Sequence, residues 1–238
     1  MPFSRALVPV APTGPDALTS AMAGIGMKFA ATPAQDPNIE DTLLFASLEA
    51  MENHDLRVLA LLVTWFGVHA PWVNADRLTK IVAAQDSARV HALWSALARW
   101  QGMDRRFARL ARIYDAQRLD LLAVGTDFQV RRHGEDPRFE TSPLRVPANV
   151  LRDRAADVEQ PAELSRHHHA YRCRVMIGPT YRADMWAAVE DDPTLSAAAL
   201  ARKTYGSFAT AWRVRRDFAV LAGAGSRQRR FRSRRGAE

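Results

Sequence analysis

The segment from Leu56 to Phe66 constrains the fold most strongly, because apolar side chains cover most faces of the helix it would form. A helix of this kind is stable only when other elements surround it. Asp55 can cap its first turn, and Gly67 followed by Pro71 is typical of a helix end. We therefore expect this helix to lie at the centre of a helical domain.

Segments with helical periodicity flank this central helix on both sides. Before it, apolar side chains recur at steps of three and four residues between Leu43 and Met51. After it, Asn74 can cap a second helix, and Asp86 or Ser87 can cap a third, which ends near Trp100. The pattern predicts a mainly α fold with few short strands, in which a loose segment (1–38) precedes a helical domain (39–130). The loose segment could hold one short helix near Ala17–Ala30.

The same domain could take the form of a winged helix. Residues 105–114 and 119–124 suit a pair of short strands after three helices. Residues 87–100 would then be its recognition helix, exposing Arg89, His91 and Arg99. Its tryptophans, however, indicate a large core or a partner surface: Trp65, Trp72, Trp94 and Trp100. Contact with a protein partner through residues 40–130, or dimerisation, is the alternative to DNA contact here.

Composition excludes several classes of protein. The chain has 238 residues, of which 47% are hydrophobic, and this is enough apolar surface for a folded core. A single cysteine excludes an internal disulfide. No apolar run reaches the roughly 18–20 residues that span a bilayer, and the N-terminus is a poor signal peptide, so we expect a cytoplasmic protein. The proline-rich stretch 131–178 reads as an irregular linker.

Positive charge is concentrated at the C-terminal end. The formal net charge is +7, but residues 199–238 hold eleven basic and only two acidic side chains. The last forty residues therefore carry +9 and the remainder of the chain −2. This asymmetry indicates a polyanionic partner and the place where it would bind.

Residues 179–222 contain a three-helix pattern. One helix spans Tyr181–Glu190, and Thr194 or Ser196 caps a second that ends near Thr204. Gly206 makes a turn, and Ser207 caps a third helix that ends near Val220. Small and apolar residues lie where the last two helices would cross: Leu200, Ala201, Ala211, Val214 and Phe218.

On these residues, Ala198–Asp217 resembles the helix-turn-helix DNA-binding family. The likeness covers about forty residues around this pattern. One departure is that Tyr205 holds the turn position where the family usually has glycine. The resemblance implies a recognition helix that starts at Ser207 and enters the major groove of DNA. It also implies a homodimer, since a dimer extends a short half-site.

The resemblance assigns contacts to named side chains. The family's base-contacting positions correspond to Ser207, Phe208, Ala209, Trp212 and Arg213. Arg213 suits a guanine edge and Phe208 a thymine methyl, while Trp212 could instead belong to the core. Phosphate contacts would come from Arg202, Lys203, Arg215 and Arg216. The tail 223–238 is expected to be disordered, and its arginines, among them Arg227, Arg229 and Arg230, would follow phosphates or simply remain solvated.

Other candidate sites read as ordinary structure. His167-His168-His169 is read as a surface segment, because consecutive side chains do not converge on one helix face. Cys173 reads as a small apolar filler, and Asp191-Asp192 as a turn before Pro193. No phosphate-binding loop, zinc-protease motif or nucleophile elbow is present. We therefore predict no catalytic residues, metal site or cofactor, and no enzyme.

The sequence thus predicts a protein that binds double-stranded DNA at specific sequences, in its plain form a transcriptional regulator. One alternative is a DNA-binding antitoxin of a toxin–antitoxin pair that represses its own operon. The other is an adaptor in a larger protein assembly, with the C-terminal helices as a docking module.

Overall fold

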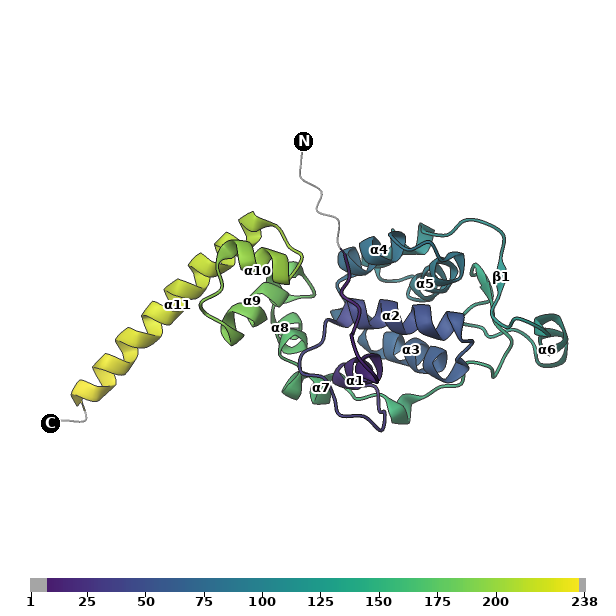
Figure 1. Ribbon diagram of the computed structural model, residues 1–238, viewed down its shortest axis with the longest axis horizontal. Helices are drawn as coiled ribbons and strands as arrows, with labels where there is room; N and C mark the ends of the chain where they lie inside the picture. The colour runs from purple at the N-terminus through teal and green to yellow at the C-terminus, as the bar shows by residue number, and fades with distance from the viewer. Residues whose placement is uncertain (1–7, 236–238) are drawn as a thin grey trace. The chain divides into compact units, whose positions relative to one another are not determined.

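The chain forms two compact units, residues 1–168 and residues 169–238 (Figure 1). The computed structural model describes the backbone of residues 8–235 and the side chains of residues 8–223. The described part is mainly helical, and its two strands are two residues long each. The expected mainly α fold is therefore confirmed.

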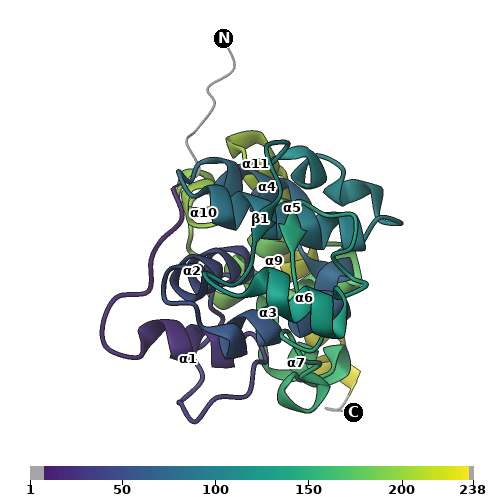
Figure 2. The same ribbon diagram turned by 90° about the vertical axis from the view of Figure 1, so that its right-hand side faces the viewer.

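The first unit is built around α3 (Leu56–His69), where every residue from Leu59 to Phe66 is buried. Helices α1 (Ala17–Gly24), α2 (Ile39–Glu52), α4 (Ala75–Ala83) and α5 (Ala88–Trp100) complete the helical part, and α2 runs beside α3 (Figures 1 and 2). The predicted caps Asp55, Asn74 and Ser87 each accept hydrogen bonds from the first turn of their helix. The central position predicted for this helix is confirmed.

Gly67 does not end α3, contrary to the prediction. The helix continues to His69 and passes into a 3₁₀ turn, η1 (Ala70–Trp72). A Cβ atom at Gly67 would lie only 2.7 Å from Cη2 of the Trp100 ring. This glycine is therefore needed because α5's last residue packs directly on the α3 backbone.

The wing predicted after α5 is not formed. Its first strand is replaced by two 3₁₀ turns, η2 (Arg105–Phe107) and η3 (Leu110–Arg112). Phe107 and Leu110 are three residues apart and both fully buried, which suits 3₁₀ periodicity and not a strand. The strand β1 (Leu119–Asp120) pairs in parallel with β2 (Leu144–Arg145), so no antiparallel hairpin exists among residues 8–168.

The predicted linker 131–178 is largely part of the first unit. It holds the end of α6 (Thr126–His133), η4 (Ala155–Asp157) and α7 (Pro161–His167). Its apolar side chains join the core: Phe139, Leu144, Val146, Leu151, Val158 and Leu164. Arg118 donates to the carbonyl oxygens of Ser142 and Phe139, both at 2.8 Å. Arginine side chains thus satisfy a non-helical backbone that sequence periodicity cannot detect.

The second unit begins about ten residues earlier than predicted. Helix α8 (His169–Ile177) precedes the three expected helices α9 (Tyr181–Asp191), α10 (Ala197–Lys203) and α11 (Phe208–Arg235). The last helix does not end near Val220, because its backbone stays helical to Arg235. The tail predicted to be disordered is therefore, up to Arg235, the second half of α11.

Candidate nucleic-acid interface

The turn between α10 and α11 has the register that the sequence predicted. Tyr205 has φ 58°, the left-handed conformation that a glycine would adopt most easily. A Cβ atom at Gly206 would overlap Cε of Met185 and lie 3.3 Å from Cβ of Tyr181. Gly206 is thus the residue that lets the turn pack against α9, while Tyr205 supplies the left-handed step.

Both helices of this motif begin at predicted serine caps. The Ser196 Oγ accepts from the backbone N of Ala199 at 3.1 Å. The Ser207 Oγ accepts from the backbone N of Thr210 at 3.1 Å and lies 2.8 Å from the Thr210 hydroxyl. Each cap satisfies a backbone donor of the first turn and fixes where the helix starts.

Small residues lie at the helix crossing, as predicted. Ala201 and Ala211 are fully buried, beside Leu200 and Val214. They join a cluster with Met185, Ala188 and Val189 of α9. Phe218 packs at the edge of this cluster, with its ring centroid 6.0 Å from that of Trp186. One side of α11 is therefore fixed by packing on α9 and α10.

The opposite side of α11 is exposed and carries the predicted base-contacting residues. Phe208 is 58% exposed and Trp212 52%, so Trp212 is not a core residue. Ser207, Ala209 and Arg213 are also exposed. Because residues three and four apart share a helix face, Phe208, Ala209, Trp212, Arg213 and Arg216 form one continuous surface, here called the α11 face.

Arg213 differs from the neighbouring arginines of α11. It makes no hydrogen bond or ion pair with another residue whose side chain is described. Arg216 lies with its guanidinium carbon 5.6 Å from the Trp212 ring centroid and pairs with Asp217 at 2.9 Å. Arg215 is half-buried and donates to the carbonyl oxygen of Pro193. Arg215 therefore braces the loop before α10, and the predicted phosphate role falls chiefly to its neighbours.

Asp217 places a negative charge beside the α11 face. It accepts from Arg182 of α9 at 2.9 Å as well as from Arg216. These hydrogen bonds lower the pKa of Asp217 below its usual range, so the carboxylate stays ionised near neutral pH. Sequence reasoning missed this triad, since nothing in the spacing of Arg182 and Asp217 indicates that they meet.

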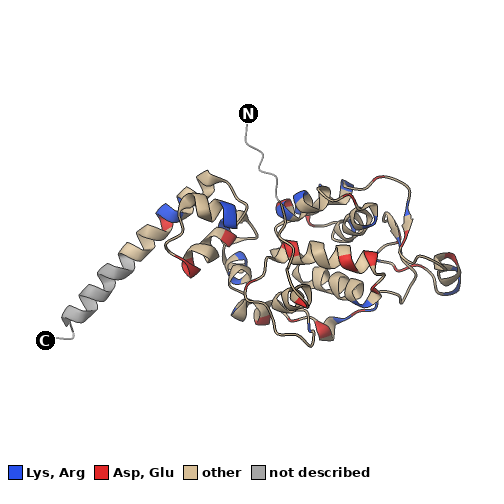
Figure 3. Cartoon of the chain, in the orientation of Figure 1, with Lys and Arg blue, Asp and Glu red and all other residues tan. Residues whose placement is uncertain are grey.

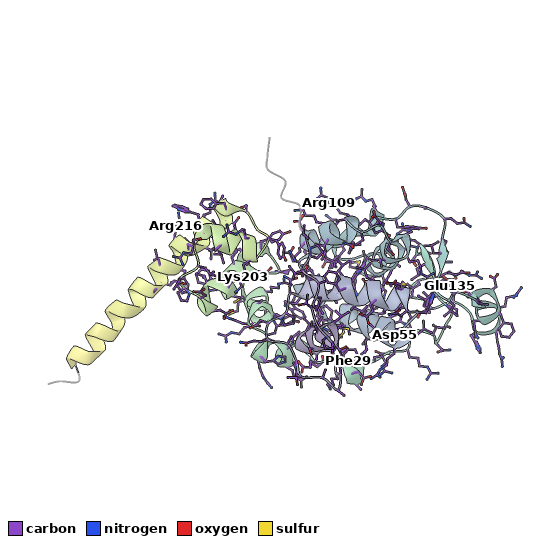
Figure 4. The ribbon with its side chains drawn as sticks, in the orientation of Figure 1. Phe29, Asp55, Arg109, Glu135, Lys203 and Arg216 are labelled. Atoms are coloured by element: carbon purple, nitrogen blue, oxygen red, sulfur yellow. The ribbon has the colours of Figure 1, made fainter. Side chains whose placement is uncertain are left out.

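Arg202 and Lys203 are exposed at the end of α10, where cations interact favourably with the helix dipole. Figure 3 shows basic residues on α10 and α11, whereas acidic residues gather at the end of α9. Figure 4 labels Lys203 and Arg216 on their two helices. The predicted tail contacts Arg227, Arg229 and Arg230 lie outside the described side chains.

Helix α5, the recognition helix of the winged-helix interpretation, has its polar side chains engaged within the first unit. Arg89 donates to the Leu121 carbonyl at 2.8 Å, and Arg99 donates to the Ala111 carbonyl at 3.2 Å. The His91 ring nitrogen lies 2.9 Å from the Val82 carbonyl. These contacts hold α5 to its neighbours. Of the two helices considered for DNA recognition, α11 is therefore the one that exposes an arginine without a described partner.

Comparison with protein-family models, curated proteins and solved structures found no match for this chain. Among the described helices, none combines the length and the apolar character that crossing a membrane requires.

Proposed function

We propose that this protein binds double-stranded DNA at specific sequences, with the α11 face in the major groove. The observation that carries the proposal is Arg213, an exposed arginine with no described partner on the second turn of a helix whose other side is packed and capped. Under this proposal the protein acts as a transcriptional regulator and binds as a homodimer.

The chemistry of the α11 face fits base recognition. A guanidinium presents a planar pair of donors that matches the two acceptors of guanine. The Phe208 ring suits contact with a thymine methyl, and the small Ala209 between them permits close approach to the base edges. Arg216 lies on this face, and Arg202 and Lys203 are exposed in the last turn of α10, before the turn that leads into α11. All three suit phosphate contacts, which position the helix without reading sequence.

The exposed apolar residues of α11 favour a second candidate, a protein-docking module. Besides Phe208 and Trp212, Val220 and Leu221 are 66% and 59% exposed on the same helix. Large exposed apolar side chains in one region are typical of protein interaction sites. The two proposals differ in which residues matter: a docking module depends on the aromatic rings, and DNA recognition depends also on Arg213.

The decisive experiment is selection of bound sequences from a random pool of duplexes, followed by fluorescence anisotropy on the enriched duplex. We expect a two-fold symmetric consensus. Arg213→Ala should weaken binding to the enriched duplex roughly tenfold to a hundredfold, corresponding to about 1–3 kcal/mol, and change binding to a scrambled duplex little.

The matched control is Arg166→Ala, which removes one exposed positive charge from α7. It should leave binding to both duplexes within about twofold. If no sequence is enriched, sequence-specific recognition is wrong and the docking module is favoured. If Arg213→Ala weakens both duplexes equally, Arg213 contacts phosphate and does not read bases.

A further inference from the structure

Three metal-ligating side chains converge between α8 and α9 within the second unit. His169 and Cys173 are one helical turn apart on α8, and Glu190 lies near the end of α9. His169 Nε2 is 2.7 Å from Glu190 Oε2, and Cys173 Sγ is 3.9 Å from the same oxygen. All three ligand atoms lie within 4.8 Å of one another. We call these residues the α8–α9 cluster.

The spacing of the α8–α9 cluster is close to that of a tetrahedral zinc site. With zinc–ligand bonds of about 2.0–2.3 Å, neighbouring ligand atoms lie roughly 3.3–3.6 Å apart. The observed separations bracket this range, so small side-chain rotations would bring the nitrogen, sulfur and oxygen onto one ion. The three ligand atoms already lie within 4.8 Å of one another.

Two further side chains orient the ligands as partners of metal sites do. His169 Nδ1 lies 2.7 Å from Asp191 Oδ1, which directs Nε2 toward Glu190 and Cys173. The indole N–H of Trp186 donates to Glu190 Oε1 at 2.9 Å, which leaves Oε2 to face the cluster. A carboxylate behind a ligating histidine fixes its tautomer and ring orientation, and a hydrogen-bonded ligating carboxylate is similarly held in place.

The cluster differs from a reactive-thiol site. Cys173 is fully buried, and burial raises the pKa of its thiol to about 12, with the nearby Glu190 charge acting in the same direction. A nucleophilic or redox-sensing cysteine has a lowered pKa and is accessible. An ion pair between histidine and carboxylates explains His169, Glu190 and Asp191. The Cys173 thiol packs beside Ala183 and Ala187 and donates to the same Glu190 oxygen that His169 contacts, so sulfur, nitrogen and oxygen meet at one point.

We propose that the α8–α9 cluster binds one Zn²⁺ ion through His169 Nε2, Cys173 Sγ and Glu190 Oε2, with a solvent molecule as fourth ligand and Asp191 as the positioning residue. Mixed nitrogen, sulfur and oxygen donors select zinc over magnesium or calcium, which take oxygen ligands. Binding releases the protons held by the thiol and by the imidazole. The ion would fasten α8 to α9, on which α10 and α11 pack.

The test uses the full-length protein after removal of metal with a chelator. Titration with Zn²⁺ alone should show one site per chain. Co²⁺ should give intense visible d–d bands and a sulfur-to-cobalt charge-transfer band in the near ultraviolet, because the site is tetrahedral and contains one thiolate. Cys173→Ser should abolish the charge-transfer band, and Asp191→Asn should weaken Zn²⁺ binding by about tenfold to a hundredfold.

The matched control is His167→Gln, which lies in the same run of three histidines but faces Glu159 at 2.7 Å. This variant should bind Zn²⁺ as the unchanged protein does. Absence of stoichiometric Zn²⁺ binding, or Co²⁺ binding without the charge-transfer band, overturns the proposal without any variant. Equal loss of binding in His167→Gln also overturns it, because the histidine run would then be the binding site.

Discussion

Helices α5 and α11 begin in the same way but differ in how much of their surface is exposed. Each follows a serine whose hydroxyl accepts from the first turn, Ser87 from Val90 at 3.3 Å and Ser207 from Thr210 at 3.1 Å. Each also carries a tryptophan, but Trp94 of α5 is fully buried and Trp212 of α11 is 52% exposed. The serine cap therefore indicates where a helix starts. The elements that pack against the helix determine which of its side chains stay exposed.

The difference comes from how many sides of each helix are covered. Helix α5 packs against α2, α4, η3 and β2, and its arginines end on backbone carbonyls. Helix α11 packs against α9 and α10 through the side that holds Ala211 and Val214. A helix held on one side by small residues can offer its other side to a groove, which α5 cannot do.

Truncating the two tryptophans tests this comparison most strongly. Trp94 donates from its indole nitrogen to the Ser47 hydroxyl at 3.0 Å, and its ring lies 5.5 Å from that of Phe66. We expect Trp94→Ala to lower the free energy of unfolding by about 3–5 kcal/mol, because it leaves a large cavity. Trp212→Ala should cost less than about 1 kcal/mol. Urea denaturation followed by circular dichroism measures both, and similar losses would break the comparison.

A second prediction concerns the pH dependence of the first unit. Burial lowers the pKa of His69 to about 4, although the Glu159 carbonyl accepts from its ring at 3.0 Å. The unfolded chain takes up this proton near pH 6.5 and the folded protein only near pH 4. Stability is therefore lost as pH falls through this window, by up to about 3 kcal/mol.

The matched variant for this prediction is His69→Gln. Its unfolding free energy should fall less steeply than that of the unchanged protein between pH 6.5 and pH 4, because glutamine does not titrate. Denaturant titrations at several pH values give both curves. Parallel curves would show that His69 is not held neutral by its buried position.

Overpacking sharpens the claim that small residues permit the crossing of α10 and α11. Ala211→Leu adds a large side chain at a fully buried crossing point, and we expect it to destabilise the second unit by about 1–3 kcal/mol. Ala209→Leu makes the same change on the exposed α11 face and should alter stability by less than about 0.5 kcal/mol. Thermal unfolding followed by circular dichroism compares the two, and equal effects would contradict the assigned core side.

The smallest expected effect concerns Tyr205. Comparing two substitutions at this position distinguishes the cost of its left-handed backbone from the loss of its side-chain packing. Both Tyr205→Ile and Tyr205→Asn remove the tyrosine ring, but a β-branched residue fits the left-handed conformation poorly and asparagine fits it well. Tyr205→Ile should therefore be less stable than Tyr205→Asn by about 1 kcal/mol. If denaturation gives equal values, the turn has relaxed to another conformation.

Local signals predicted the second unit better than the first. The caps Ser196 and Ser207, the left-handed Tyr205 and the buried Ala201 and Ala211 all follow from patterns within about twenty residues. In the first unit, residues 131–168 are held by long-range contacts such as Arg118 with the Phe139 carbonyl. Helical or strand periodicity in the sequence does not indicate such contacts, so the sequence predicts a linker here.

At the candidate sites, too, the sequence does not predict contacts between residues of different elements. The exposed position of Arg213 followed from helical spacing, but the ties of Arg215 to Pro193 and of Asp217 to Arg182 join different elements and could not be read from the sequence. For the α8–α9 cluster, the sequence contains one indication of the site. His169 lies four residues before Cys173, so the two share a helix face. The neighbouring His167 and His168 mask this spacing, because three consecutive histidines do not share one helix face.

Asp217 has a consequence for selectivity under the proposed function. Its carboxylate pairs with the Arg216 guanidinium much as a phosphate would. Asp217 therefore competes with the DNA phosphates for Arg216. A duplex that gains only phosphate contacts must displace this competitor to engage Arg216. A duplex that also satisfies Arg213 has additional binding energy to do so. The aspartate would thus widen the gap between the intended site and the large excess of other DNA.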